Sequence, residues 1–269
     1  MNFGLLARNL LFLIAATAGV THAQVFGTVE SVHGNVHIVG PEGQNLSVQT
    51  GQQLTVGQTV QTQSNSEVHI ATQDGGLLAL RANTSFQMLQ YKPEADSTGQ
   101  IAMSLVRGAL RSISGWIGKI NPKGYRITTP TATIGIRGTD HETTVLEVSH
   151  GRDEAGTYDS VLEGATLVRS GDKEIHLEAG EHGFAPKGEG SALRRLTERP
   201  DFLAQRRLLM EDRIQERKER LKQQLIEKAA TLPEQTRSAL RAKLESMDSE
   251  ARAAAKKRLL RKPPRRSSD

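Results

Sequence analysis

The densest group of ionisable side chains in the sequence is Asp140-His141-Glu142, within the stretch TPTATIGIRGTDHETTV. A histidine beside carboxylates has the composition of a general acid–base pair. On an extended strand, however, neighbouring side chains point to opposite faces, so His141 would oppose both carboxylates rather than be oriented by one of them. We therefore favour a structural or surface role for this group, and we predict no catalytic residue.

The same stretch contains two glycines around Arg137, which could indicate a phosphate-binding loop. Such a loop needs a lysine and a following helix, whereas here β-branched residues continue to Val145. The alternation predicts a strand that turns Ala132, Ile134, Ile136 and Gly138 inward and a threonine-rich face outward. We expect Gly138 to turn or bulge the strand with a positive φ. We expect Arg137 to pair with a carboxylate or cap backbone carbonyls. The candidates for a structural or interaction role are Arg137, Gly138, Thr139, Asp140 and His141.

Metal and cofactor chemistry find little support in the sequence. It contains no cysteine, which excludes disulfides, a catalytic thiol and thiolate metal sites. His33 and His37 are four residues apart around a glycine, but on a strand four residues span roughly 13 Å, too far to share an ion unless the chain turns. The nucleophile elbow, the zinc-protease helix and the Walker loop are absent from the sequence. We predict no metal site and no cofactor.

The first 23 residues have the three parts of a secretory signal peptide. Arg8 supplies a positive charge, Leu10 to Val20 form an apolar stretch, and Thr21-His22-Ala23 ends in a small residue. The apolar stretch is shorter than the roughly 20 residues that a membrane helix needs. We expect cleavage after Ala23, no transmembrane span, and a mature protein that is periplasmic or secreted.

Charge and glycine divide the mature chain into two regions. Residues 193–269 contain 22 Lys and Arg against 12 Asp and Glu, whereas residues 1–192 have an excess of acids. Glycine is frequent up to Gly190 and absent afterwards. These shifts predict an all-β domain over residues 24–186 and a linker over residues 187–199.

Short alternating runs between glycine turns predict the β domain. Val36 and Ile38 follow Gly34, and the pairs Val68/Ile70 and Leu78/Leu80 flank Asp74-Gly75-Gly76. The spacing of similar units is irregular. We predict a mainly β fold, either a β-sandwich or a twisted, β-solenoid-like stack, with residues 110–119 as a loop or short helix.

Residues 200–262 are expected to form an α-helical hairpin. The first helix, to Thr231, has an apolar stripe that Arg217 interrupts, and Pro233 separates it from a second helix with a coiled-coil-like seam. The stripe of the first helix comprises Leu203, Met210, Ile214, Leu221 and Leu225. The seam of the second comprises Leu240, Leu244, Met247, Ala251 and Ala254. These surfaces could pair with each other, with the β domain or with a second chain. Residues 263–269 are expected to be a disordered basic tail.

The order of motifs resembles the FecR domain of bacterial envelope proteins. The resemblance is carried by the segments GTVESVHGNVHIV (Gly27–Val39), LTVGQTVQTQSNSEVHIATQDGGLLALRANTSF (Leu54–Phe86), IAMSLVRG (Ile101–Gly108), TPTATIGIRGTDHE (Thr129–Glu142), LEGATLVRS (Leu162–Ser170) and LEAGEHG (Leu177–Gly183). It implies an all-β extracytoplasmic module that makes protein contacts, in a family that includes regulators relaying an outer-membrane transport signal to a sigma factor. It does not imply an enzyme.

Two departures bear on that resemblance. Signalling members have a cytoplasmic segment and a membrane helix before the β module, whereas this sequence begins with a signal peptide. A signalling role would then require a membrane partner. In the central motif, His141 stands where the family pattern leads us to expect a bulky apolar residue.

The sequence therefore predicts a non-enzymatic envelope protein whose β domain binds a protein partner and whose helices dock or self-associate. The alternative is binding of a polyanion or an anionic surface through the basic C-terminal helices. Nucleic acid is not expected, because residues 203–269 contain no aromatic side chain to stack on a base.

Overall fold

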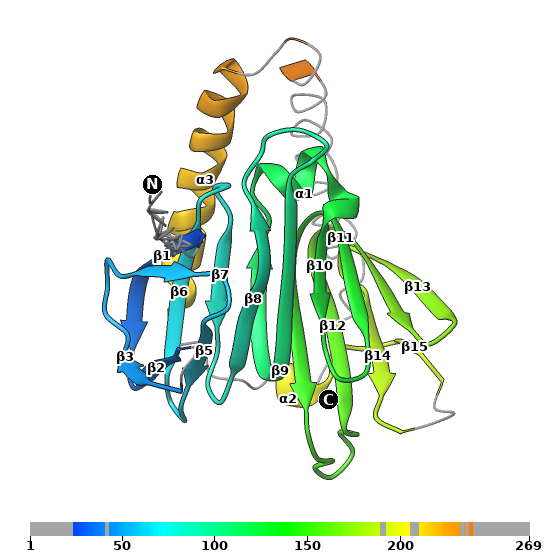
Figure 1. The fold of residues 1–269 in the computed structure, drawn as a ribbon. Coiled ribbons are helices and arrows are strands. Elements are labelled where there is room, and N and C mark those ends of the chain that lie inside the picture. Colours follow the sequence, from blue (N-terminus) through cyan, green and yellow to red (C-terminus); the bar gives the residue numbers. More distant parts are fainter. Residues whose placement is uncertain are drawn as a thin grey trace, which may run out of the picture.

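The computed structural model describes residues 24–40, 43–188, 192–204, 210–231, 234, 237 and 238. The predicted signal peptide (1–23), the basic tail (263–269) and the second arm of the predicted hairpin, from residue 239 onward, lie outside these residues. In the described part the chain is mainly β, as the sequence predicted (Figure 1).

The strands are β1 (Val25–His33), β2 (Val36–Val39), β3 (Asn45–Ser47), β4 (Gln53–Thr55), β5 (Thr59–Thr62), β6 (Glu67–Thr72), β7 (Leu77–Leu80), β8 (Ser85–Lys92), β9 (Gln100–Ile113), β10 (Tyr125–Thr128), β11 (Thr133–Leu146), β12 (Gly156–Ser170), β13 (Lys173–Glu178), β14 (His182–Pro186) and β15 (Arg194–Leu196). The helices are α1 (Trp116–Ile120), the 3-10 turn η1 (Pro122–Gly124), α2 (Asp201–Ala204) and α3 (Glu211–Thr231).

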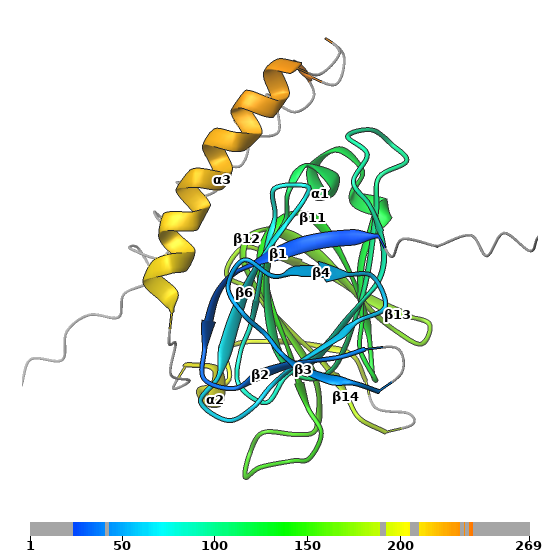
Figure 2. The same ribbon diagram turned by 60° about the vertical axis from the view of Figure 1, so that its left-hand side comes forward.

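These strands form one mixed sheet. The prediction of either a β-sandwich or a β-solenoid-like stack is therefore corrected. The reason lies in the long strands β9, β11 and β12. The first half of β9 pairs with β8 and β10, whereas its second half pairs with β7 and β11. A strand whose two halves have different neighbours carries the sheet from one side of the core to the other, and the sheet curves around that core (Figure 2).

The core lies on the inner side of this curved sheet. The alternation read from the sequence places the expected residues there, with Val36, Ile38, Val68, Ile70, Leu78 and Leu80 all buried in one cluster. The predicted turn at Asp74-Gly75-Gly76 joins the antiparallel strands β6 and β7, and Gly75 has φ +71°. Residues 110–119, expected as a loop or short helix, end β9 and begin α1, whose Ile117 enters the core.

The C-terminal region packs against the outside of the sheet. The segment 187–199, expected as a linker, contains β15, which pairs with β14. Leu203 of α2 packs against Tyr158 and Phe184, whose rings stack with centroids 4.2 Å apart. The first helix of the predicted hairpin was expected to run from Pro200 to Thr231. The described residues of this segment form two helices, α2 and α3, and Met210 lies in a bend directly before α3. Helix α3 stands against the outer side of the sheet and projects beyond it (Figure 2).

Candidate functional site

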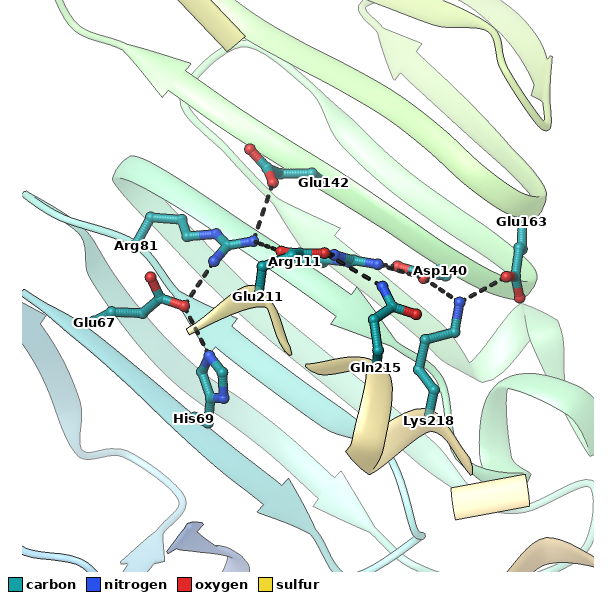
Figure 3. A network of polar contacts seen from close by, with 10 residues as sticks. All are labelled: Glu67, His69, Arg81, Arg111, Asp140, Glu142, Glu163, Glu211, Gln215 and Lys218. Carbon is teal, nitrogen blue, oxygen red and sulfur yellow. Dashed lines mark hydrogen bonds and ion pairs between the residues drawn. The ribbon is translucent and has the colours of Figure 1, made fainter. Parts of the chain in front are cut away.

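A network of charged side chains lies between α3 and the outer side of the sheet (Figure 3). At its centre, Arg111 of β9 donates two hydrogen bonds to Asp140 of β11, from Nε and Nη2 to the two carboxylate oxygens, each 2.8 Å long. Both side chains are almost completely buried. A bidentate Arg–carboxylate pair of this kind fixes orientation as well as charge.

A β-bulge puts Asp140 on this side of the sheet. Before it, Ile134 and Ile136 of β11 face the core, as the sequence predicted, and after it the core residue is Val145. The inward positions therefore change from even to odd numbers, because Gly138 has φ +60° and the pairing with β12 shifts between Arg137 and His141. Without the extra residue, Asp140 and Glu142 would face the apolar core.

In strand β9 the positions that face the core also change, here from odd to even numbers, at Gly108, which has φ +85°. Leu105 faces the core before this glycine and Leu110 faces it afterwards. Arg111 therefore points outward, beside Ile113, and meets the carboxylate of Asp140 from the neighbouring strand. Two bulges in adjacent strands thus bring one buried ion pair to the outer face.

A second buried pair lies two strands away. Arg81, directly after β7, donates from Nη1 to Glu67 Oε1 of β6 at 2.6 Å, and His69 Nε2 lies 2.8 Å from the same oxygen. Arg81 Nη2 lies 3.8 Å from a carboxylate oxygen of Glu142. The outer face therefore carries two arginines held in place by carboxylates of the sheet itself.

Helix α3 contacts this face through three side chains on one side of the helix. Glu211 accepts hydrogen bonds from both arginines, Arg81 Nη2 at 3.2 Å and Arg111 Nη1. Ile214 is fully buried in a small cluster with Leu77, Ala79 and Ile113. Lys218 Nζ donates to Asp140 at 2.8 Å and to Glu163 of β12 at 2.6 Å. We call the sheet residues Leu77, Ala79, Arg81, Arg111, Asp140 and Glu163 the docking face.

Arg217 extends the contact to β1. It interrupts the apolar stripe in the sequence, yet it is buried, with Nε 3.2 Å from Glu30 Oε1. The two groups are close enough for an ion pair but are not aligned as a hydrogen bond. Burial lowers the pKa of Arg217, and Glu30 offsets part of that effect. The buried side of α3 is therefore mixed apolar and basic rather than an apolar stripe.

The pKa shifts of Asp140, Glu211 and Lys218 favour the charged forms of these three groups. Burial alone would raise the pKa of Asp140, but the hydrogen bonds and charge of Arg111, together with Lys218, hold it below its usual value. Glu211 likewise has a lowered pKa, because the two arginines outweigh its partial burial. The pKa of Lys218 is raised, because Asp140 and Glu163 outweigh desolvation.

His141 lies on the other side of β11, in a separate buried group. Its Nδ1 is 2.9 Å from Asp159 Oδ1, and Asp159 also accepts hydrogen bonds from Thr143 and Thr166. The ring is fully buried, and its Nε2 makes no hydrogen bond to the described residues. The ring is therefore packed in the interior of the domain, on the opposite side of β11 from Asp140.

The residues singled out in the sequence have different environments. Asp140 joins the network at the docking face, whereas His141 joins the interior group. Thr139 is buried and donates its backbone N–H to Ser114 Oγ at 3.0 Å, although an outward position was expected. Arg137 is exposed, and its side chain has no ion pair or hydrogen bond within the described part of the chain. The carboxylate partner expected for Arg137 is therefore not found there.

A groove adjoins the docking face at Arg81. It has a volume of about 660 Å³ and is lined by Glu67 and Arg81 of the network together with Arg107, Val148 and His150. Val148 is 59% exposed. The groove thus combines an apolar contact with charged walls.

Comparison with known families concerns the central part of the chain. The model of the FecR protein family matches residues 58–167. This chain carries a FecR domain. The resemblance seen in the motifs is therefore confirmed, and all six residues of the docking face belong to the matched segment, whereas α3 lies outside it.

The solved structures similar to the chain resemble it weakly. Two crystal structures of a putative anti-sigma factor from Parabacteroides distasonis ATCC 8503 share 15% identity with it, with TM-scores of 0.40 and 0.41. Each match covers 54% of this chain and 62% of the other. A cell surface anchoring domain is 23% identical with a TM-score of 0.23, over 24% of this chain and 84% of that domain. No curated protein matches the chain.

Two further properties concern the described residues alone. None of the helices there is both long and apolar enough to span a membrane. Among these residues, no group of three or more histidine, aspartate or glutamate side chains is arranged to hold a metal ion. His37, one of the two histidines considered for a metal, has its Nε2 3.4 Å from the Gln63 side chain.

Proposed function

We propose that this protein is a non-enzymatic, signalling-associated interaction module of the bacterial envelope, whose FecR domain binds a protein partner. The observation that carries the proposal is the docking face. Its buried charged side chains form ion pairs between strands and with helix α3. Complementary charges of this kind give specificity to the recognition of a protein segment. The FecR domain supports this function, because its family makes protein contacts in the envelope.

The histidine–carboxylate group supports a structural role. A general base must reach the proton that it removes, at about 3 Å or through one water. His141 is fully buried and is held by Asp159, which is in turn bound by two threonine hydroxyls. We propose that this group stabilises the domain and takes no part in a reaction.

We further propose that the protein is exported and acts in the periplasm or after release. The signal-peptide pattern of residues 1–23 motivates this proposal. Signal transfer to the cytoplasm would then pass through a membrane protein that the FecR domain contacts. Intact-mass measurement of protein recovered from the periplasm or the medium tests export, with Gln24 as the expected first residue. A protein that retains Met1 in the cytoplasm would contradict it.

The anionic-surface alternative gains no support from α3. Two of its basic residues, Arg217 and Lys218, face Glu30, Asp140 and Glu163 rather than solvent. Arg213 and Arg220 of α3 are exposed, whereas the basic segment that follows α3, together with the second helix proposed for self-association, lies outside the described residues.

Site-specific photo-cross-linking in living cells tests the proposed function. A photoreactive amino acid at Val148, in the groove beside the docking face, should cross-link to a partner protein. Leu46 of β3 is the matched control, since it is a similarly exposed apolar residue, 53% against 59%. A specific product at position 148 and none at position 46 is expected. Absence of any product, or identical products from both positions, would count against a partner at this face.

A further inference from the structure

We propose that the docking face is a binding site for an amphipathic helix of the partner, and that α3 is its intramolecular occupant, which the partner's helix replaces. The inference rests on the proposed function for the existence of a partner. It adds the secondary structure and the chemistry of the segment that is bound.

The face selects a helix by three contacts. The carboxylate of Glu211 reaches both arginines, Ile214 enters the apolar cluster, and Lys218 lies between two carboxylates. These residues follow at i, i+3 and i+7, which places them on one side of an α-helix. A partner's helix would therefore carry an acidic residue, a branched apolar residue one turn later, and a basic residue after one further turn.

The sheet holds its side of the contact without α3. Besides their contacts with α3, Arg81 is paired with Glu67, and Arg111 with both oxygens of Asp140, so these pairs do not require the helix. The ion pairs of the sheet thus keep the two arginines oriented when the helix leaves. Such preorganisation lowers the cost of binding a second helix at the same place.

Among the α3 side chains that the structure describes, those that contact the sheet lie between Glu211 and Lys218. Beyond Lys218, every side chain of α3 that the structure describes is exposed, namely Glu219, Arg220, Gln223, Gln224, Ile226 and Glu227. Ile214 is the α3 side chain that enters the apolar cluster. All residues of the docking face lie within the FecR match, residues 58–167, and α3 follows it in the sequence.

A competing helix can make contacts that α3 does not make. The groove adjoins the docking face at Arg81, and its lining presents Arg107, Val148 and His150 but none of the described residues of α3. Because α3 is covalently attached, it competes at a high effective concentration. A partner's helix must therefore bind more tightly than α3 itself, and the groove offers the additional surface.

Binding of a labelled peptide to the full chain tests this inference. The probe is a fluorescent peptide of residues 210–231. The opened variant is Ile214→Asp with Lys218→Glu, which weakens the chain's own α3 but leaves every sheet residue intact. The matched control is Ile226→Asp with Arg220→Glu, which makes the same changes in charge at exposed positions of the helix. A melting transition measured for each protein confirms that the β domain is folded.

We expect the opened variant to bind the peptide at least tenfold more tightly than the wild type or the control. A peptide carrying the Ile214→Asp and Lys218→Glu changes should not bind. Equal binding by all three proteins, or no binding by a folded opened variant, would overturn the inference. A wild-type dimer that exchanges α3 between two copies would assign the face to self-association instead. None of these outcomes depends on the cross-link at Val148, so failure here leaves the proposed function to its own test.

Discussion

Arg111 and Asp140 form a bidentate ion pair that links β9 to β11 beneath α3, with both N–O distances at 2.8 Å. Lys218 of α3 donates to the same carboxylate. The pair therefore serves two purposes at once, since it joins two strands of the FecR domain and receives the helix that covers them.

Removal of Arg111 should destabilise the fold strongly. Arg111→Ala leaves Asp140 buried with Lys218 as its remaining partner. Breaking a buried ion pair by deleting one partner typically costs about 3–5 kcal/mol of unfolding free energy. Urea unfolding measures this effect. Arg137→Ala is the control, because its exposed side chain has no partner among the described residues, and its unfolding free energy should stay near that of the wild type. Equal effects of the two substitutions would contradict the importance of the pair.

Acid should weaken the protein partly through Asp140. The folded-state pKa of Asp140 lies below its ordinary value of 3.8, so its contribution to stability is present above about pH 4 and is lost as the pH falls through the lower folded value. Asp74 has a pKa raised by burial and changes with pH in the opposite sense. Unfolding free energies of wild type and Asp140→Asn, measured from pH 7 to pH 2, isolate the effect of Asp140. The difference between the two proteins should shrink in acid, and a constant difference would be inconsistent with the lowered pKa.

Strain at the bulge should make Gly164 intolerant of a side chain. Gly164 has φ +74°, and a Cβ there would lie 2.2 Å from the backbone oxygen of Gly138. Gly151 has a similar φ of +62°, but a Cβ at that position would meet nothing within 4 Å among the described residues. Gly151→Ala should therefore cost only the conformational strain of about 1–2 kcal/mol, and Gly164→Ala clearly more. Thermal melting of the two variants measures the difference. Equal melting temperatures would show that the backbone at the bulge can move.

His141 and Asp159 should be energetically coupled. They are in contact inside the domain, and residues in one hydrogen-bond network commonly show coupling of about 0.5–3 kcal/mol. A double-mutant cycle with His141→Ala and Asp159→Ala, followed by urea unfolding, measures this coupling. If the losses of unfolding free energy caused by the two substitutions are additive, the two side chains are not coupled and the prediction is wrong.

The sequence predicts the core better than it predicts the site. Alternation identifies Val68, Ile70, Leu78 and Leu80 correctly, because each run reports the face of its own strand. The bulge at Gly138 is also predicted, since glycine is suited to its positive φ. Local patterns of this kind depend on neighbouring residues alone, so the features that they indicate can be predicted without knowledge of the fold.

The docking face depends on pairings that local patterns do not contain. Arg111 and Asp140 are 29 residues apart, and Lys218 is 78 residues from Asp140. Their meeting requires both the register of β9 with β11 and the change of inward positions after the two bulges. A signal was nonetheless present in Arg217, a cation within an apolar stripe, which indicates a helix side that faces carboxylates. Arg81, which directly follows the apolar run Leu77–Leu80, indicates the same for the sheet.

The account depends above all on α3 covering the docking face as a separable helix. Because the chain has no cysteine, a single Ala79→Cys substitution places one thiol in the cluster beneath Ile214. Ala185→Cys places one in the main core, which only global unfolding exposes. The measurement is the rate of thiol labelling in each protein, with and without Lys218→Glu. We predict that Lys218→Glu accelerates labelling at position 79 at least tenfold and leaves position 185 unchanged. Equal acceleration at both positions, or none at position 79, would contradict the account.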